Sequence, residues 1–399
     1  MSDGPVSSLD PFALAARQIV IDRASTARHN RLFERKKKRL QESPLGFLRG
    51  SARLFYEILA FEPSLGLEGG PRGAVVGDMH LENVGAYRTE ADEIVFHLND
   101  FDDAGVAPLW VDTLRLSTSV LLAGRSFQAT ANESLGLVHD LLHAYEEALA
   151  GNEVPQNLPK PIAELCDRAA KRSRKELLDM RAPVENGQRR FSRGDRYFDL
   201  DEDETAELPG LIEAYKAALG SAAPSHAASW SVQDAAHRVA GNGSLGRRRI
   251  ALLLVDDKKE ERIFELKEAK PSAMEALFGP VDECPSTRVV SAARALVSTP
   301  PRQLAAIPET PLGSFLGRKL CPEEDKLELA RLSVGKTLSQ VARSVGTILG
   351  RSHRRAAVDL PPKPREAEER ADLVDRAIRL AGLLESVYLA YARLTEKTG

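Results

Sequence analysis

Three polar residues stand where short apolar runs end, at a spacing that suits phosphate chemistry. Asp78 and Asn83 lie five apart after Val75 and Val76, and Asp100 follows a second apolar run. Phosphoryl transfer needs a carboxylate to accept the proton of the attacking hydroxyl, and oxygen ligands for Mg²⁺ bound to the phosphates. Mg²⁺ prefers one or two carboxylate or amide oxygens together with water and phosphate. We therefore expect Asp78 to be the base, and Asn83 and Asp100 to be metal ligands.

A glycine-rich segment further along the chain has the spacing G-x-G-x-x-G. Its candidate phosphate-binding residues are Gly241, Asn242, Gly243, Ser244 and Gly246. Dinucleotide-binding folds share this spacing but continue directly into a helix. Here the apolar run "RRRIALLLV" follows without a capping residue, which favours a strand. A glycine loop between two strands covers the phosphates in protein kinases, because backbone amides without Cβ atoms can approach them closely. The alternative is an ordinary glycine-rich hairpin turn.

A lysine on the next predicted strand is the candidate phosphate-pairing cation. Lys267 lies in "RIFELKEA", after a polar turn, and Lys270 is its nearest rival. We favour Lys267 because the run "RIFEL" places it within the sheet rather than beyond its end. The alternative for Lys267 is a surface position on an edge strand.

These motifs resemble a known superfamily. The segments "VVGDMHLEN" and "FHLNDFDDAGVAPLWVDTLRL" look like the catalytic core of the aminoglycoside phosphotransferase and choline kinase branch of the protein-kinase-like superfamily. The resemblance implies roles for six residues. Asp78 would be the catalytic base and His80 the loop histidine. Asn83, Asp100 and Asp102 would be metal ligands, and Asp112 would brace the catalytic loop. The resemblance further implies a two-lobed α+β fold, ATP and Mg²⁺ as cofactors, and phosphate transfer to a hydroxyl acceptor that the sequence does not identify. The chain also resembles, from about residue 45 to 395, a large uncharacterised bacterial family.

The order of the motifs differs from that of an ordinary kinase, where the glycine loop precedes the catalytic loop. A circular permutation explains the order, and permutation is tolerated where the new chain ends are exposed. The expected parts are an N-terminal helical segment (1–60) and a lobe with the catalytic loop and a helical insert (61–229). A β-rich lobe with the glycine loop (230–322) and C-terminal helices (323–399) follow.

Two features depart from the kinase pattern. Glu265 stands two residues before Lys267, where the wall of an adenine pocket usually has a small apolar residue, so the carboxylate needs a partner. The glutamate that should pair with Lys267 is also open among Glu268, Glu275 and Glu283, of which we favour Glu275.

Other classes of function were weighed on the same residues. A two-metal phosphoesterase shares "GDMH" but needs further histidine ligands, and His139 and His143 are the one helical pair among eight histidines. An inactive nucleotide-binding scaffold and a nucleotidyl transferase of the same fold remain alternatives. Serine hydrolysis lacks a G-x-S-x-G motif.

Composition limits the remaining classes. The chain of 399 residues is 43% hydrophobic and 28% charged, which predicts a globular protein of two or three lobes. The longest aliphatic run, Ile250 to Val255, is too short to cross a bilayer, and no signal pattern opens the sequence, so we expect a cytoplasmic protein without a membrane partner. Three scattered cysteines, Cys166, Cys284 and Cys321, predict neither disulfides nor structural zinc.

Charge predicts no nucleic-acid partner, because the formal net charge is −3. The run "RKKKR" at 35–39 is a local exception. We expect it to form a solvated helix face, with an anionic partner as the alternative.

Overall fold

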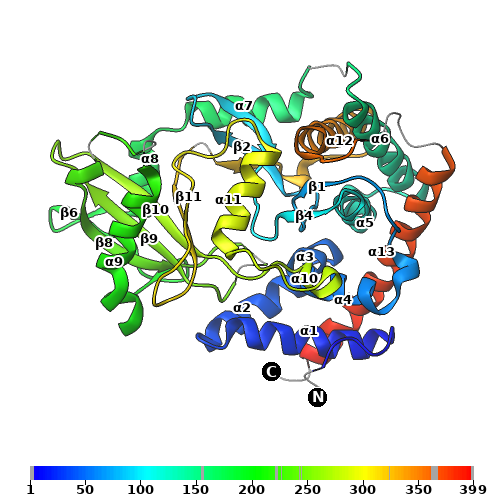
Figure 1. Ribbon diagram of the computed structural model, residues 1–399, viewed down its shortest axis with the longest axis horizontal. Helices are drawn as coiled ribbons and strands as arrows, with labels where there is room; N and C mark the ends of the chain where they lie inside the picture. Colours follow the sequence, from blue (N-terminus) through cyan, green and yellow to red (C-terminus); the bar gives the residue numbers. More distant parts are fainter. Residues whose placement is uncertain are drawn as a thin grey trace.

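The protein has a mixed α+β fold, with helices gathered at one end and most strands at the other (Figure 1). The computed structural model describes residues 4–153, 157–220, 223–225, 227–241, 243, 245–322, 324–360 and 367–396. The helices are α1 (Pro11–Thr26), α2 (Asn30–Gln41), α3 (Pro44–Gly50), α4 (Ala52–Phe61), α5 (Trp110–Phe127), α6 (Ala131–Ala150), α7 (Lys160–Lys171), α8 (Arg174–Arg181), α9 (Glu202–Leu219), α10 (Glu275–Phe278), α11 (Pro285–Leu296), α12 (Lys336–Ala356) and α13 (Ala367–Glu396). The strands are β1 (Arg72–Val75), β2 (Val84–Arg88), β3 (Ile94–Leu98), β4 (Gly105–Pro108), β5 (Val184–Glu185), β6 (Gln188–Arg189), β7 (Tyr197–Phe198), β8 (Ser231–Arg238), β9 (Arg249–Val255), β10 (Glu261–Glu268), β11 (Ala305–Ile307), β12 (Phe315–Lys319) and β13 (Asp325–Lys326).

The largest sheet carries the glycine-rich segment. Within the described residues it is antiparallel and has the strand order β11-β12-β10-β9-β8-β7. The segment with the glycines joins β8 to β9, and β9 forms a hairpin with β10. Asp256 closes that hairpin, because its Oδ1 accepts from the backbone N–H groups of Lys258 and Glu260 at 3.0 and 2.9 Å.

This sheet is buried on both faces, which explains why β9 is apolar at almost every position. On one face α9 places Tyr215 against Phe264 and Ile250. A Cβ atom added to Gly317 of β12 would lie 2.2 Å from the ring of Tyr215, so only glycine fits there. Residues from α8 to β7 cover the other face in a second apolar cluster. The structure thus differs from the expected division at residue 229, because α8 to α9 pack on the sheet of the following segment.

Two small sheets bring the acidic loops together. β1 pairs with β4, and β2 lies between β3 and β13, all antiparallel. The segment after β1 holds Asp78, and the segment between β3 and β4 holds Asp100. Because β13 follows the large sheet in the chain, its pairing with β2 joins the two parts of the molecule.

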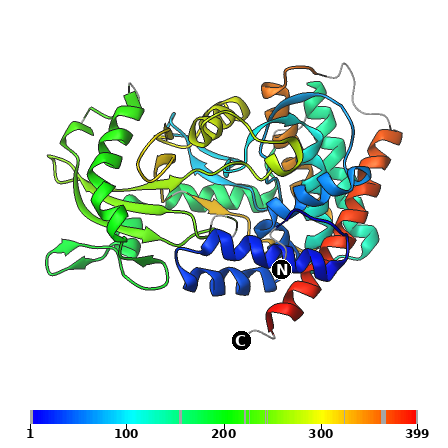
Figure 2. The ribbon, with the colours of Figure 1, turned by 60° about the horizontal axis from the view of Figure 1, so that its bottom comes forward.

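The helical part packs around α5, α6, α12 and α13, with α1 beside α13 (Figure 1). Figure 2 shows α1 and α2 lying across the boundary between this part and the strands. α6 and α12 approach closely, since Cβ atoms on Gly346 and Gly350 of α12 would lie 2.1 Å from the carbonyl oxygen of Leu141 and 2.3 Å from that of Tyr145. No helix in the described part of the chain combines the length and apolarity needed to cross a membrane.

The close contact of α6 and α12 gives a first prediction. Gly346→Ala should lower the free energy of unfolding by about 1–3 kcal/mol, because the new methyl group meets a backbone oxygen that cannot move aside. Urea denaturation measures the change. Gly136→Ala on α6 is the matched control, because no atom lies within 4 Å of its added Cβ; it should raise stability by about 0.4–1 kcal/mol. Equal losses in both variants would contradict the packing argument.

Candidate functional site

The loop after β1 is held by a buried carboxylate on α5. The two oxygens of Asp112 accept from the backbone N–H groups of Val76 at 2.7 Å and Gly77 at 2.9 Å. Nε2 of His353 lies 3.0 Å from Asp112 Oδ2, and the hydroxyl of Tyr145 lies 2.9 Å from His353 Nδ1. Each of these side chains is at most 1% exposed. Buried hydrogen bonds to an ionised group are strong, so the loop is rigid. This is the position expected for Asp112.

Gly77 lets the loop turn at its start. Its φ is +78°, and a Cβ atom there would lie 2.3 Å from the carbonyl oxygen of Asp103. The hydroxyl of Tyr56 donates to the Gly77 carbonyl from α4. Asp78 therefore emerges from a loop fixed on both sides.

Asp78 faces a buried arginine. Nε of Arg115 donates to its Oδ1 at 2.8 Å, while Nη2 of the same guanidinium donates to the carbonyl of Leu48 at 2.8 Å. The guanidinium also lies over the ring of Phe55, 4.7 Å from the centroid. Burial raises the pKa of Asp78 to about 7, because the desolvation penalty, together with the nearby charge of Asp103, outweighs the lowering effect of Arg115. A carboxyl with this pKa can take and release a proton near neutral pH.

Asn83 links the two acidic loops. Its Nδ2 donates to the backbone carbonyls of Asp78 and Asp100, both at 3.1 Å. Its Oδ1 is buried and accepts no hydrogen bond in the described structure. An unsatisfied buried acceptor costs about 1–3 kcal/mol, so this oxygen fits a site that a ligand completes. An amide oxygen suits Mg²⁺.

Asp100 stands at the edge of the same site, with its side chain 52% exposed. Burial would raise the pKa of Asp100, but the charges of Lys267 and Lys326 outweigh it and hold that pKa below its usual range. Asp100 is therefore an ionised carboxylate that solvent can reach.

Lys267 lies on β10 and reaches toward these carboxylates. Its Nζ pairs with Asp102 and lies 3.8 Å from Oδ1 of Asp100. Burial lowers the pKa of Lys267, and the two aspartates oppose that shift. Asp102 also lies 3.4 Å from Nη1 of Arg247. Asp102, expected as a metal ligand, is thus the ion-pair partner of Lys267 in this structure.

The structure does not bring the expected glutamate to Lys267. Glu275 begins α10, and its Oε1 accepts from the backbone N–H of Ser272 at 3.1 Å. Glu268 pairs with Lys270, and Glu283 is exposed. The charge that balances Lys267 therefore comes from the acidic loop, and the preference for Glu275 is corrected.

The glycine-rich segment lies over Asp78. A Cβ atom on Gly243 would lie 4.0 Å from Oδ2 of Asp78 and 3.3 Å from the carbonyl oxygen of Arg49. Gly246 has φ +96°, and its Cβ would lie 2.0 Å from the carbonyl oxygen of Ser25. The glycines thus permit a close approach that side chains would prevent. Gly241 lines the adjoining cavity, whereas Asn242 and Ser244 fall outside the described residues.

His80 is turned onto its own loop. Nδ1 accepts from the backbone N–H of Glu82 at 3.1 Å. Burial, aided by the charges of Arg49 and Lys326, lowers the pKa of His80 well below its ordinary value, so the ring is neutral. We assign His80 to the shape of the loop rather than to proton transfer.

A cavity of about 360 Å³ lies between the large sheet and the acidic loops. Its walls include Asp100, Asp102 and Lys267. Glu265 also lines it and is fully buried, in ion pairs with three arginines that supply the partner the sequence left open: Arg238, Arg249 and Arg318.

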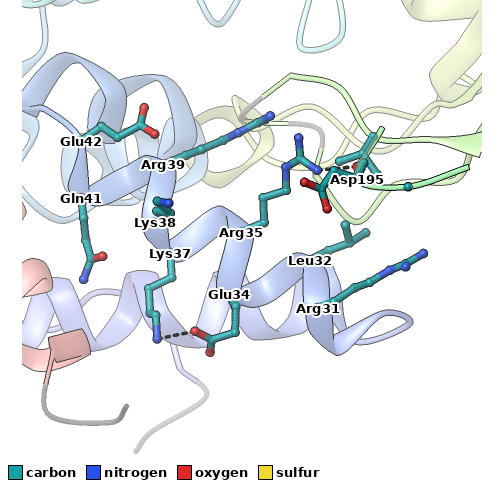
Figure 3. Close-up of a pocket in the computed structure, with 12 residues that line it drawn as sticks. Arg31, Leu32, Glu34, Arg35, Lys37, Lys38, Arg39, Gln41, Glu42 and Asp195 are labelled. Atoms are coloured by element: carbon teal, nitrogen blue, oxygen red, sulfur yellow. Dashed lines mark hydrogen bonds and ion pairs between the residues drawn. The ribbon is translucent and has the colours of Figure 1, made fainter. Parts of the chain in front are cut away.

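The basic run on α2 is more than a solvated helix face. Lys36 is buried, with its Nζ 2.9 Å from Oδ1 of Asp22 on α1. Arg39 donates to the carbonyl of Gly241 in the glycine-rich segment. Figure 3 shows the remaining basic side chains around an open cavity of about 700 Å³ on this face. Part of the run therefore holds α2 in place and ties it to the glycine-rich segment.

Several site residues were not expected from the sequence. Arg115 had a signal, since it lies three residues after Asp112 and thus on the same face of α5. His353 had none, because it lies 241 residues from the aspartate it contacts. Arg288 of α11 also had none; it donates to the backbone carbonyls of Asp102 at 3.1 Å and Lys270 at 3.0 Å.

Within the described ranges, no group of three or more His, Cys, Asp or Glu side chains is arranged to hold a metal ion. The two-metal centre of a phosphoesterase thus has no counterpart among them. A site that takes one amide oxygen and one carboxylate from the protein does not require such a group.

A family model described as an uncharacterised protein conserved in bacteria (DUF2252) matches residues 28–398. No curated protein and no solved structure matched the chain. Because the matched residues cover nearly the whole sequence, the protein belongs to the bacterial family DUF2252.

Proposed function

We propose that the protein is an Mg²⁺-dependent phosphotransferase of kinase-like fold, in which an acceptor hydroxyl attacks a phosphorus of a nucleoside triphosphate. The observation that carries the proposal is the place of Asn83. Its amide joins the backbones of Asp78 and Asp100, its oxygen is unsatisfied, and Gly243 of the glycine-rich segment lies close to the Asp78 carboxylate. Phosphoryl transfer from ATP is the reaction that the sequence resemblance implies.

The proposed roles follow from the contacts. Asp78 accepts the proton of the acceptor hydroxyl, and Arg115 keeps its carboxylate oriented. Asn83 Oδ1 and Asp100 would hold Mg²⁺, which would neutralise charge at the phosphates. Lys267, which pairs with Asp102 in this structure, would pair with a phosphate oxygen, and the Asp102 carboxylate would then be available to the metal.

The chain order supports a circular permutation of that fold. The N–H of Val358, just after α12, donates to the carbonyl of Arg72 at the start of β1 at 2.8 Å, and Ala357 pairs with Gly73. In an ordinary kinase order, a long helix runs into the strand before the catalytic loop. Here the end of α12 lies beside that strand, although the two are far apart in the sequence.

An inactive nucleotide-binding scaffold is the main alternative from the same fold. A decayed site would be expected to lose some of its chemical groups, whereas here Asn83 links Asp78 to Asp100, and Asp100 lies beside Lys267. This arrangement favours activity over scaffolding.

The metal-site assignment can be tested by binding. Asp100→Ala should abolish the rise in melting temperature that Mg²⁺-ATP gives the wild type, because the carboxylate ligand is lost. Asp78→Asn should keep that rise but lower nucleotide turnover by about a hundredfold or more, because only the base is lost. Differential scanning fluorimetry and chromatography of the nucleotide products measure the two effects. Asp282→Ala, an exposed aspartate outside the cavity, is the matched control and should change neither. Unaltered turnover in Asp78→Asn would refute the assignment of the base, and a wild type that binds no Mg²⁺-nucleotide would refute the function.

The pKa of Asp78 gives a pH dependence. Burial raises this pKa to about 7, and the base acts only when ionised, so turnover should reach half its maximum near pH 7 and still be rising toward about pH 8. Bound Mg²⁺ favours the carboxylate and should move the rise to lower pH as its concentration increases. Initial rates of Mg²⁺-ATP turnover between about pH 5 and pH 8, at two Mg²⁺ concentrations, test this. A rate independent of pH across that range would contradict the role of Asp78.

A further inference from the structure

The sheet face above the cavity carries cations where a base-binding pocket would be apolar. Arg249 pairs in register with Lys267, and Glu265 pairs with Arg318 on the neighbouring strand. Residues two apart on a strand share a face, so these four side chains project to the same side. All four line the cavity of about 360 Å³, and Arg238 lines it from β8.

The arginines there outnumber the carboxylates that hold them. Glu265 is shared by Arg238, by Arg249 at 3.4 Å and by Arg318 at 3.5 Å. Glu324 is a second carboxylate, and it pairs with Arg318 at 3.0 Å. Three guanidinium groups therefore face two carboxylates.

Hydrogen bonding in the cluster is incomplete as well. Among the residues that the structure describes, Nε of Arg238 and Nε of Arg249 find no acceptor and Oε1 of Glu265 finds no donor, although all three atoms are buried. Buried donors of this kind are normally satisfied, so the cluster is completed by an acceptor-rich ligand.

The chemistry of these groups selects the part of a nucleotide that rests on them. A base ring is bound mainly by apolar and aromatic walls, with a few polar groups that set its orientation. Guanidinium groups match phosphate oxygens through paired, charge-assisted hydrogen bonds. The sheet face above the cavity therefore suits phosphates better than a base.

We infer that Arg238, Arg249 and Arg318 bind the β- and γ-phosphates of the nucleotide, so that its α-phosphorus faces Asp78 and the protein transfers a nucleoside monophosphate. This inference rests on the proposed function and specifies which phosphorus is attacked. The acceptor oxygen forms a bond to the α-phosphorus, and the bond from that phosphorus to the bridging oxygen of the β-phosphate breaks. Asp78 takes the proton of the acceptor hydroxyl, and pyrophosphate leaves into the arginine cluster.

The products of turnover show which phosphorus of the nucleotide is attacked. The protein is incubated with Mg²⁺ and ATP labelled at either the α- or the γ-phosphate, with water and the protein's own hydroxyl groups as acceptors. The inference expects α-label on the protein or in AMP, and γ-label in pyrophosphate. Label from the γ-phosphate on the protein, or release of ADP and phosphate, would overturn the inference and leave the proposed function intact.

A binding measurement needs no acceptor. Mg²⁺-tripolyphosphate is titrated into the protein by calorimetry, and Arg318→Gln or Arg249→Gln should each weaken its binding by about tenfold, as expected for one charge-assisted contact. Arg174→Gln is the matched control, because Arg174 forms an exposed ion pair with Glu260 outside the cavity. This variant should bind Mg²⁺-tripolyphosphate as tightly as the wild type. Melting temperatures show whether each variant is folded. The side chain of Arg318 is 25% exposed, so Arg318→Gln should disturb the fold less than Arg249→Gln.

The outcomes separate the two claims. Tripolyphosphate binding that is unchanged in both arginine variants would overturn the inference, as would a wild type that binds Mg²⁺-ATP but not Mg²⁺-tripolyphosphate. A wild type that binds neither would refute the proposed function itself.

Discussion

The shape of the site depends on the buried carboxylate of Asp112, which accepts hydrogen bonds from two backbone N–H groups in place of backbone acceptors. The N–H groups of Val76 and Gly77 stand where the chain leaves β1, and Asp112 accepts from both. Buried N–H groups without acceptors are costly, so the loop adopts this shape only while α5 holds its place. His353 and Tyr145 extend the network to α12 and α6, which pack closely at two glycines. The geometry around Asp78 is thus a property of the helical part as a whole.

The second constraint is the approach of the glycine-rich segment to that loop. The segment belongs to the large sheet, yet it contacts Asp78, Ser25 and Arg39 of the other part of the molecule. Leu32 of α2 also packs with Val239 and Leu245, which stand on either side of Gly241 and Gly243 in the sequence. The helices α1 and α2 therefore support the segment from outside, as their position in Figure 2 illustrates. In this way a strand–loop–strand unit that could open freely is held over the acidic loops.

The charged side chains of the cavity form two groups. Lys267 is compensated by Asp100 and Asp102, next to the unsatisfied oxygen of Asn83. Glu265 is compensated by arginines from β8, β9 and β12, with donors to spare. A ligand that brings both divalent metal and phosphate would satisfy both groups at once. This is the physical basis on which we propose a metal-bound nucleotide with its phosphates deep in the cavity.

The sequence by itself determined the local elements and the main chemical groups. Two apolar runs around a polar, charged turn marked the β9–β10 hairpin, and the spacing of Asp78, Asn83 and Asp100 indicated a metal-assisted site, because such patterns act over a few residues. Pairings between distant residues were decided only by the tertiary structure. Asp102 rather than Glu275 balances Lys267, and His353 reaches Asp112 across most of the chain, because a charge pairs with whichever neighbour packing brings near. The covering of the sheet by α8 and α9 was decided in the same way, since an apolar face shows in sequence that it must be buried but not which helix will bury it.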